Sequence, residues 1–152
     1  MFRGDLPLSL DPKGRLAIPT RYRDRIAETC GGALVATISL TERCLVIYPS
    51  PEWRRIEQQL QAFPAFDPQA QAISRLLIGH AIECEMDGQG RILVPPSLRE
   101  LASLDRRVRM IGQVNKFELW DEDLWSARRT ELLGQVGGLL KEPSEALRNL
   151  VL

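Results

Sequence analysis

The stretch Asp11-Pro12-Lys13-Gly14-Arg15-Leu16-Ala17-Ile18-Pro19 returns later in the chain as Asp87-Gly88-Gln89-Gly90-Arg91-Ile92-Leu93-Val94-Pro95. Aspartate, glycine, arginine and proline each recur after the same number of positions, from 11 to 87, from 14 to 90, from 15 to 91 and from 19 to 95. Repetition at a fixed spacing predicts that the chain is two copies of one small β-rich unit. A duplicated, exposed arginine turn suits a pseudo-symmetric partner such as DNA better than it suits an enzyme cleft.

The composition indicates an ordinary globular protein. The chain has 152 residues, 44% of them hydrophobic and 26% charged, which fits one domain or two intimately joined halves. It has no apolar run near the roughly eighteen residues of a transmembrane helix, and its first residues lack the apolar core of a signal peptide. We therefore expect a cytosolic protein with no membrane partner.

Charge is balanced overall but not locally. The formal net charge is zero, so the protein as a whole exerts no long-range attraction on a polyanion. Between residues 9 and 25 five basic residues face two acidic ones, a local balance of +3, whereas the matching stretch 85–99 balances to zero. Any nucleic-acid binding must therefore come from a local patch, and the first copy is the more basic one.

Alternating apolar residues predict a strand on either side of each repeated turn. The segments 6–10 and 16–18 should form one hairpin, and the segments 82–86 and 92–94 should form the equivalent hairpin of the second half. A second hairpin per half is predicted from the apolar segments, which are 33–40 with 45–48 and 108–111 with 117–120.

Proline, glycine and capping residues mark the helices. Short helices are expected at 20–28 and 97–103, and Ser50 and Asp121 begin two longer ones. In the first long helix, a buried stripe is predicted from the apolar side chains of Trp53, Ile56, Leu60 and Phe63. Asp67 should cap a connecting helix. The second long helix is expected to end near Leu133, before Gly137-Gly138, and a short amphipathic helix with Leu147, Leu150 and Val151 on its apolar side could follow Pro143-Ser144.

The parts of the repeated turn have separable roles. Asp11 and Asp87 stand where a carboxylate accepts backbone amides, and Gly14 and Gly90 permit a positive φ. Arg15 and Arg91 begin the second strand on the face opposite its apolar residues, so both should point outward, where a guanidinium offers bidentate donors to phosphate or guanine. The simpler alternative is a charged turn that serves solubility. Hairpin folding does not require the arginine, however, so its presence in both copies needs another account.

Other candidate chemistry is weak. His80 is the only histidine, and Cys30, Cys44 and Cys84 contain no closely spaced pair, so we expect reduced thiols and no metal site. No catalytic triad signature, phosphate-binding glycine loop or carboxylate pair is present. The three tryptophans should be core or subunit-interface residues. We expect no enzyme activity, no cofactor and no small-molecule substrate.

Several linked motifs together resemble the MraZ family of bacterial transcriptional regulators. They are Phe2-Arg3-Gly4, the two Asp-x-x-Gly-Arg turns, and Phe117-Glu118-Leu119-Trp120 before Trp125. The resemblance spans about residues 2–133, and each half resembles one SpoVT-AbrB-type DNA-binding domain. It implies an α+β fold in which two AbrB-like repeats form a swapped-hairpin, double-split β-barrel with flanking helices. We divide the chain into a first repeat (1–66), a connecting helix (67–79), a second repeat (80–136) and a tail (137–152).

The resemblance also implies a function. Members of this family assemble into rings, bind short direct repeats in double-stranded promoter DNA ahead of the division and cell-wall gene cluster, and repress it together with their own gene. The implied assembly is a ring homo-oligomer, with an octamer as the first guess, and the implied location is the cytoplasm, at the nucleoid.

Carried over by position, the DNA contacts fall on Lys13, Arg15 and Arg91. Gln89 replaces a lysine and offers a possible adenine reader, and Arg21 and Arg23 could reach flanking phosphates, although an exposed helix face is equally credible. Two alternatives remain open at this point: an AbrB-like antitoxin that also binds a toxin, and a structural ring without specific DNA binding.

Overall fold

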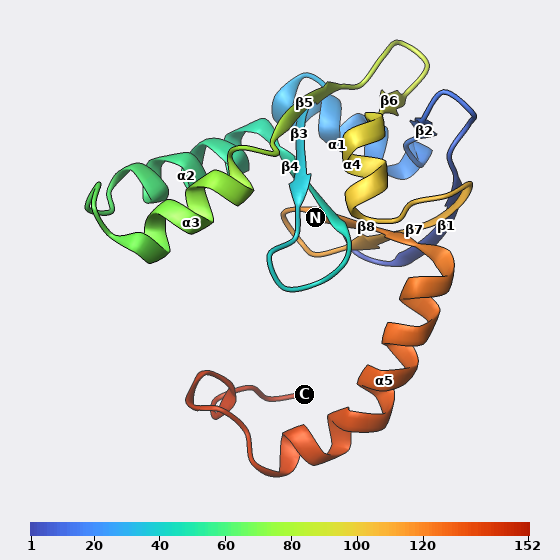
Figure 1. The fold of residues 1–152 in the computed structure, drawn as a ribbon. Coiled ribbons are helices and arrows are strands. Elements are labelled where there is room, and N and C mark those ends of the chain that lie inside the picture. The colour runs from blue at the N-terminus through green and yellow to red at the C-terminus, as the bar shows by residue number, and fades with distance from the viewer. The chain divides into compact units, whose positions relative to one another are not determined.

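The computed structural model describes residues 1–152, which divide into two compact units, Met1–Glu122 and Asp123–Leu152. The first unit mixes helices with antiparallel strands (Figure 1). In chain order the elements of the protein are β1 (Asp5–Ser9), β2 (Arg15–Ala17), α1 (Thr20–Cys30), β3 (Ala33–Ile38), β4 (Leu45–Pro49), α2 (Ser50–Gln61), α3 (Pro68–Leu77), β5 (Ile82–Glu85), β6 (Arg91–Leu93), α4 (Pro96–Leu101), β7 (Arg107–Gly112), β8 (Phe117–Asp121) and α5 (Glu122–Lys141).

The strands form a six-stranded antiparallel sheet in the order β1-β7-β8-β4-β3-β5 and a separate two-stranded ladder, β2-β6. The order is symmetric about its centre, because β5 repeats β1, β3 is the counterpart of β7, and β4 is the counterpart of β8. A pseudo-twofold axis therefore passes between β4 and β8 and relates the two repeats.

The predicted hairpins around the two arginine turns are wrong in their pairing. β1 pairs with β7, β5 pairs with β3, and β2 pairs with β6, so each of these strands takes its partner from the other repeat. Only an isolated bridge between Leu10 and Leu16 joins the segments that flank the first turn. The reason is burial: exchange places Leu16 directly opposite its equivalent Ile92, and both side chains are fully buried.

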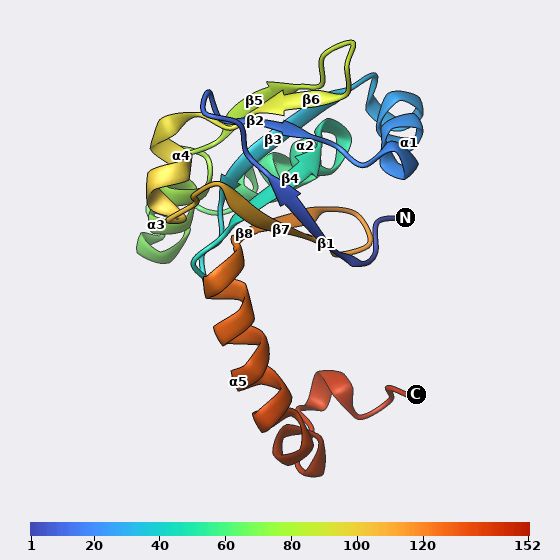
Figure 2. The same ribbon diagram turned by 90° about the vertical axis from the view of Figure 1, so that its right-hand side faces the viewer.

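The swapped-hairpin, double-split β-barrel implied by the resemblance is not seen as a closed barrel, since the six-stranded sheet and the β2-β6 ladder remain separate sheets. Figure 2 shows the ladder lying beside the larger sheet. The second hairpin of each half forms as expected. β3 pairs with β4 along five positions, and β7 pairs with β8 along five.

One main core joins both repeats. Its fully buried members come in equivalent sets, such as Ile18 with Val94 from the strand ends and Ile26 of α1 with Ala102 at the end of α4. A smaller cluster of Val35, Val46, Tyr48 and Trp53 packs beside α2 and α3. Because the main core draws on both halves, neither repeat has a complete core of its own.

The helix boundaries follow local signals at some positions and not at others. Asp67 caps α3 as predicted, since its carboxylate accepts the backbone amides of Gln69 and Ala70 at 2.9 and 3.1 Å. The predicted stripe on α2 is only partly correct. Trp53 is buried, but Phe63 lies beyond the end of the helix and is 55% exposed.

In the second unit, α5 does not end before Gly137-Gly138 but continues to Lys141. Helix-interior glycine costs only about 1 kcal/mol, so the pair weakens a helix without forbidding it. The expected amphipathic helix of the tail is a single 3₁₀ turn, Glu145–Leu147, and Leu147, Leu150 and Val151 are exposed. None of the protein's helices combines the length and apolar character needed to span a membrane.

Candidate nucleic-acid interface

The first arginine turn is organised by Asp11. One carboxylate oxygen accepts the backbone amides of Lys13 and Arg15 at 2.9 and 2.8 Å, and the other pairs with Nε of Arg15 at 2.6 Å. The amide of Arg15 contributes most to holding the pKa of Asp11 below its ordinary value, and the Arg15 guanidinium lowers it further. The carboxylate thus stays charged and fixes both the turn and the root of the arginine side chain.

The second turn repeats this arrangement with looser side-chain contacts. Asp87 accepts the amides of Gln89 and Arg91 at 2.8 and 3.0 Å, and its other oxygen lies 3.3 Å from Nε of Arg91. The pKa of Asp87 is also lowered, chiefly by the amide of Arg91. The two turns therefore share one backbone design, while the aspartate–arginine contact is shorter in the first.

Both turns depend on a buried glycine with positive φ, 85° at Gly14 and 75° at Gly90. The carbonyl of each glycine accepts an amide from the other repeat, from Val94 to Gly14 and from Ile18 to Gly90, both at 2.8 Å. Each turn is thus fastened to the end of the partner repeat's strand.

Strand exchange brings Arg15 and Arg91 onto the same surface. In the β2-β6 ladder Arg15 lies opposite Leu93, and Ala17 lies opposite Arg91, so all four residues share one face. The opposite face carries the buried Leu16 and Ile92. The arginine side chains are 36% and 31% exposed. They occupy diagonal positions, for which the typical separation across a ladder is about 7–8 Å.

A second pair of arginines crosses between the repeats. Arg23, on α1, donates from Nε to the carbonyl of Ile18 at 2.7 Å and lies against Gly90 of the second turn. Its equivalent Arg99, on α4, donates to the carbonyl of Val94 at 3.0 Å and lies against Gly14 of the first turn. Sequence reasoning selected Arg23 but passed over Arg99, although the repeat spacing that links Arg15 to Arg91 also links Arg23 to Arg99.

The remaining basic residues of the first repeat spread over different parts of the structure. Lys13 is exposed at the tip of the first turn, and Gln89 is exposed at the matching place of the second. Arg21 lies over the Tyr22 ring at 4.8 Å, and Arg25 donates to the carbonyl of Met1 at 2.8 Å. The basic residues of segment 9–25 therefore do not form one patch, because Arg23 lies at the second turn. Arg99, from the second repeat, adds a positive charge at the first turn.

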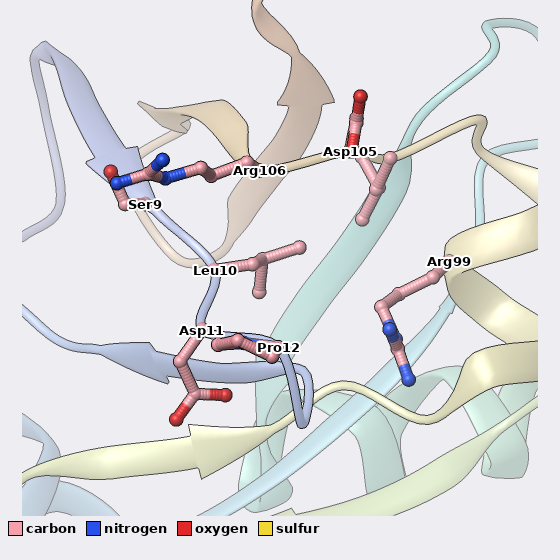
Figure 3. Close-up of a pocket in the computed structure, with 8 residues that line it drawn as sticks. Ser9, Leu10, Asp11, Pro12, Arg99, Asp105 and Arg106 are labelled. Carbon is pink, nitrogen blue, oxygen red and sulfur yellow. The ribbon is translucent and has the colours of Figure 1, made fainter.

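A pocket of about 680 Å³ adjoins the first turn (Figure 3). Its walls come from both repeats and consist of Ser9, Leu10, Asp11, Pro12, Arg99, Leu104, Asp105 and Arg106. The cysteines lie elsewhere as free thiols, and burial raises the pKa of Cys44 to about 12 and that of Cys84 to about 11.

Comparison with known proteins agrees with this duplicated architecture. The family model described as "MraZ protein, putative antitoxin-like" matches residues 1–76 and again residues 77–133. Among similar proteins, one from Thioalkalivibrio sulfidiphilus is 55% identical and one from Halorhodospira halophila is 54% identical, each over 152 residues and the whole of both chains. A protein from Pseudomonas aeruginosa is 50% identical over 155 residues, again covering both chains completely.

All three relatives bear the name "Transcriptional regulator MraZ", which defines the class as regulators of transcription. Full-length identity at this level, together with a family match in both repeats, establishes the relationship. The chain belongs to the MraZ family.

Proposed function

We propose that this regulator binds promoter DNA in a sequence-specific manner through the outward face of the β2-β6 ladder. The observation that carries the proposal is the common face of Arg15 and Arg91, each anchored by an aspartate of its own turn. Because the aspartate engages Nε, the terminal nitrogens of each guanidinium offer donors to a guanine edge or a phosphate. An anchored arginine also loses less side-chain entropy on binding than a freely rotating one.

The surrounding residues have supporting roles in this proposal. Lys13 contacts a phosphate beside Arg15, whereas Gln89 stands at the same place beside Arg91 and suits an adenine edge. Arg21 and Arg23 serve flanking phosphates. The turn residues Asp11, Gly14, Asp87 and Gly90 hold the contact residues in place.

The proposed regulatory unit is a ring homo-oligomer, with an octamer as the first subunit number to test. The ring binds short direct repeats ahead of the division and cell-wall gene cluster. One neutral subunit that makes a few phosphate contacts binds weakly, and a ring that engages several repeats multiplies modest affinities. The proposed outcome is repression of that cluster and of the protein's own gene, in the cytoplasm at the nucleoid.

The decisive test compares Arg15→Ala and Arg91→Ala with Arg54→Ala, which removes the same charge from an exposed position on α2. DNA from upstream of the protein's own gene, intact or with its repeats scrambled, is titrated by fluorescence anisotropy, and oligomeric mass is measured in parallel. We expect both ladder variants to lose at least tenfold in affinity for the intact repeats with an unchanged mass, and Arg54→Ala to retain binding. Unchanged affinity in both ladder variants would refute the assignment.

The description of the matched family as antitoxin-like favours one second candidate, a protein that also binds a toxin. A partner that co-purifies with the wild-type protein at fixed stoichiometry and is released by DNA would support it. Wild-type binding that survives scrambling of the repeats would instead indicate a structural ring without specific recognition.

A further inference from the structure

The pocket beside the first turn combines two arginines with an apolar floor. Leu10 lies at its centre, Pro12 and Leu104 add apolar surface, and the arginines are Arg99 from α4 and Arg106 from the segment before β7. Figure 3 shows Arg106 and Arg99 at opposite ends, with Leu10 between them.

The two acidic residues of the pocket point away from its apolar floor. The Asp11 carboxylate turns toward its own turn, where it binds two backbone amides and Arg15. Asp105 projects away from Leu10 (Figure 3). Two separated cations along an apolar floor match a sugar-phosphate backbone, in which charged phosphates alternate with less polar sugars.

One of the two pocket arginines, Arg106, has no equivalent beside the second turn. The amide of Leu10 donates to the carbonyl of Arg106 at 2.8 Å, and in the other repeat the amide of Met86 donates to the carbonyl of Gly32 at 2.9 Å. Gly32 thus occupies the position that corresponds to Arg106, and Gly31 the position that corresponds to Asp105. One turn has an additional arginine that the other lacks.

We propose that this pocket seats the DNA backbone next to the base-reading first turn, with Arg106 and Arg99 each holding one phosphate. The inference rests on the proposed DNA binding and adds two contacts to it. Phosphate contacts fix the position and orientation of a protein on DNA without reading sequence. Arg106 therefore strengthens binding at the first turn for every sequence and makes the two turns unequal.

Arg106 is the residue to change, because the fold uses only its backbone carbonyl, which alanine retains. The test measures the affinity of Arg106→Ala, Arg106→Lys and Arg54→Ala for intact and scrambled promoter DNA over a range of salt concentrations. We expect Arg106→Ala to bind both DNAs about tenfold more weakly at low salt and to reduce the salt slope by about 0.9. Lysine should restore the slope, and Arg54→Ala should match the wild type.

Several results would overturn the inference. One is an unchanged salt slope in Arg106→Ala, and another is a loss confined to the intact promoter, which would make Arg106 a base reader. A third is saturable calorimetric binding of inorganic pyrophosphate to the wild type that Arg106→Ala abolishes, since the pocket would then be a small-ligand site. If Arg15→Ala and Arg106→Ala both leave binding unchanged, the proposed DNA face itself is wrong, whereas a defect in Arg15→Ala alone removes only the pocket contact.

Discussion

The two arginine turns have nearly the same backbone hydrogen bonds and different surroundings. Each has an aspartate that accepts two amides, a buried glycine with positive φ and an arginine on the shared ladder face. The first turn adds Lys13 and the charged pocket, whereas the second has Gln89 and the Gly31-Gly32 pair. The comparison shows that the features needed for folding are kept in both copies, while the features that alter charge differ between them.

The largest expected effect is the loss of stability when a turn glycine is replaced by alanine. Its size should depend on which atoms the new Cβ would contact. A Cβ on Gly14 would lie 2.7 Å from the backbone carbonyl oxygen of Val94, whereas one on Gly90 would meet the movable side chain of Arg23. We expect Gly14→Ala to lower the free energy of unfolding by about 3 kcal/mol and Gly90→Ala by about 2 kcal/mol, as measured by urea denaturation.

Gly31→Ala is the matched control for these variants. Gly31 also has a positive φ, 62°, but a Cβ there would meet nothing within 4 Å. Gly31→Ala should therefore lower the free energy of unfolding only by the cost of placing alanine at a positive φ, about 1 kcal/mol. Equal losses in all three variants would mean that contacts with the other repeat add nothing to the stability of the turns.

The next prediction concerns Arg23 and Arg99 and tests whether each of these arginines stabilises the turn of the opposite repeat. Arg99→Ala removes a hydrogen bond to Val94 and the side chain that lies against Gly14, so we expect about 1 kcal/mol of destabilisation. Amide hydrogen exchange should accelerate at Lys13 and Arg15 and remain unchanged at Gln89 and Arg91. Arg23→Ala should give the reverse pattern, and acceleration confined to the mutated repeat would argue against this coupling.

A smaller effect concerns the residue at each turn tip. Lys13→Gln makes the first turn resemble the second and should lower the salt slope of DNA binding by about 0.9, with a several-fold loss of affinity at low salt. Gln89→Lys should raise the slope by a similar amount. Parallel salt titrations of both variants measure the difference, and a slope that responds to neither change would place the turn tips away from the phosphates.

The smallest expected effect is the loss of folding stability at acid pH as Asp11 and Asp87 become protonated. Their pKa values in the folded protein lie below the ordinary 3.8, so their stabilising effect is present above that value and is lost as the pH falls through the lowered pKa. Asp11→Asn and Asp87→Asn should each flatten the fall in urea midpoint below about pH 4. Asp11→Asn should remove the larger share, because its arginine contact is shorter. Wild-type acid dependence in both variants would contradict this.

Local sequence signals predicted the local elements well. The cap at Asp67, the proline before α1 and the repeated Asp-x-x-Gly turns each act within a few residues, so a sequence pattern contains the necessary information. Strand pairing does not depend on neighbours in this way. The alternation of residues 6–10 fits a partner in either repeat, and the main core, which draws on both repeats, favours the partner from the other repeat.

The same limitation explains the incomplete site. Arg23 looked like part of the first copy's basic segment, but strand exchange places it at the second turn. The pocket around Leu10 joins residues nearly a hundred positions apart, so no linear window contains both walls. The helix across Gly137-Gly138 departs from the prediction for a different reason, because a glycine pair lowers helix propensity only modestly and does not by itself end a helix.

The partnership between β1 and β7 also governs how the chain can fold during synthesis. Asp5 pairs with Ile111, so β1 leaves the ribosome long before its partner has been translated. Until then the first repeat exposes unpaired strand edges and an incomplete core, a condition that slows folding and promotes aggregation. Because β2 and β5 also take their partners from the other repeat, the fold can be completed only after most of the second repeat has been synthesised.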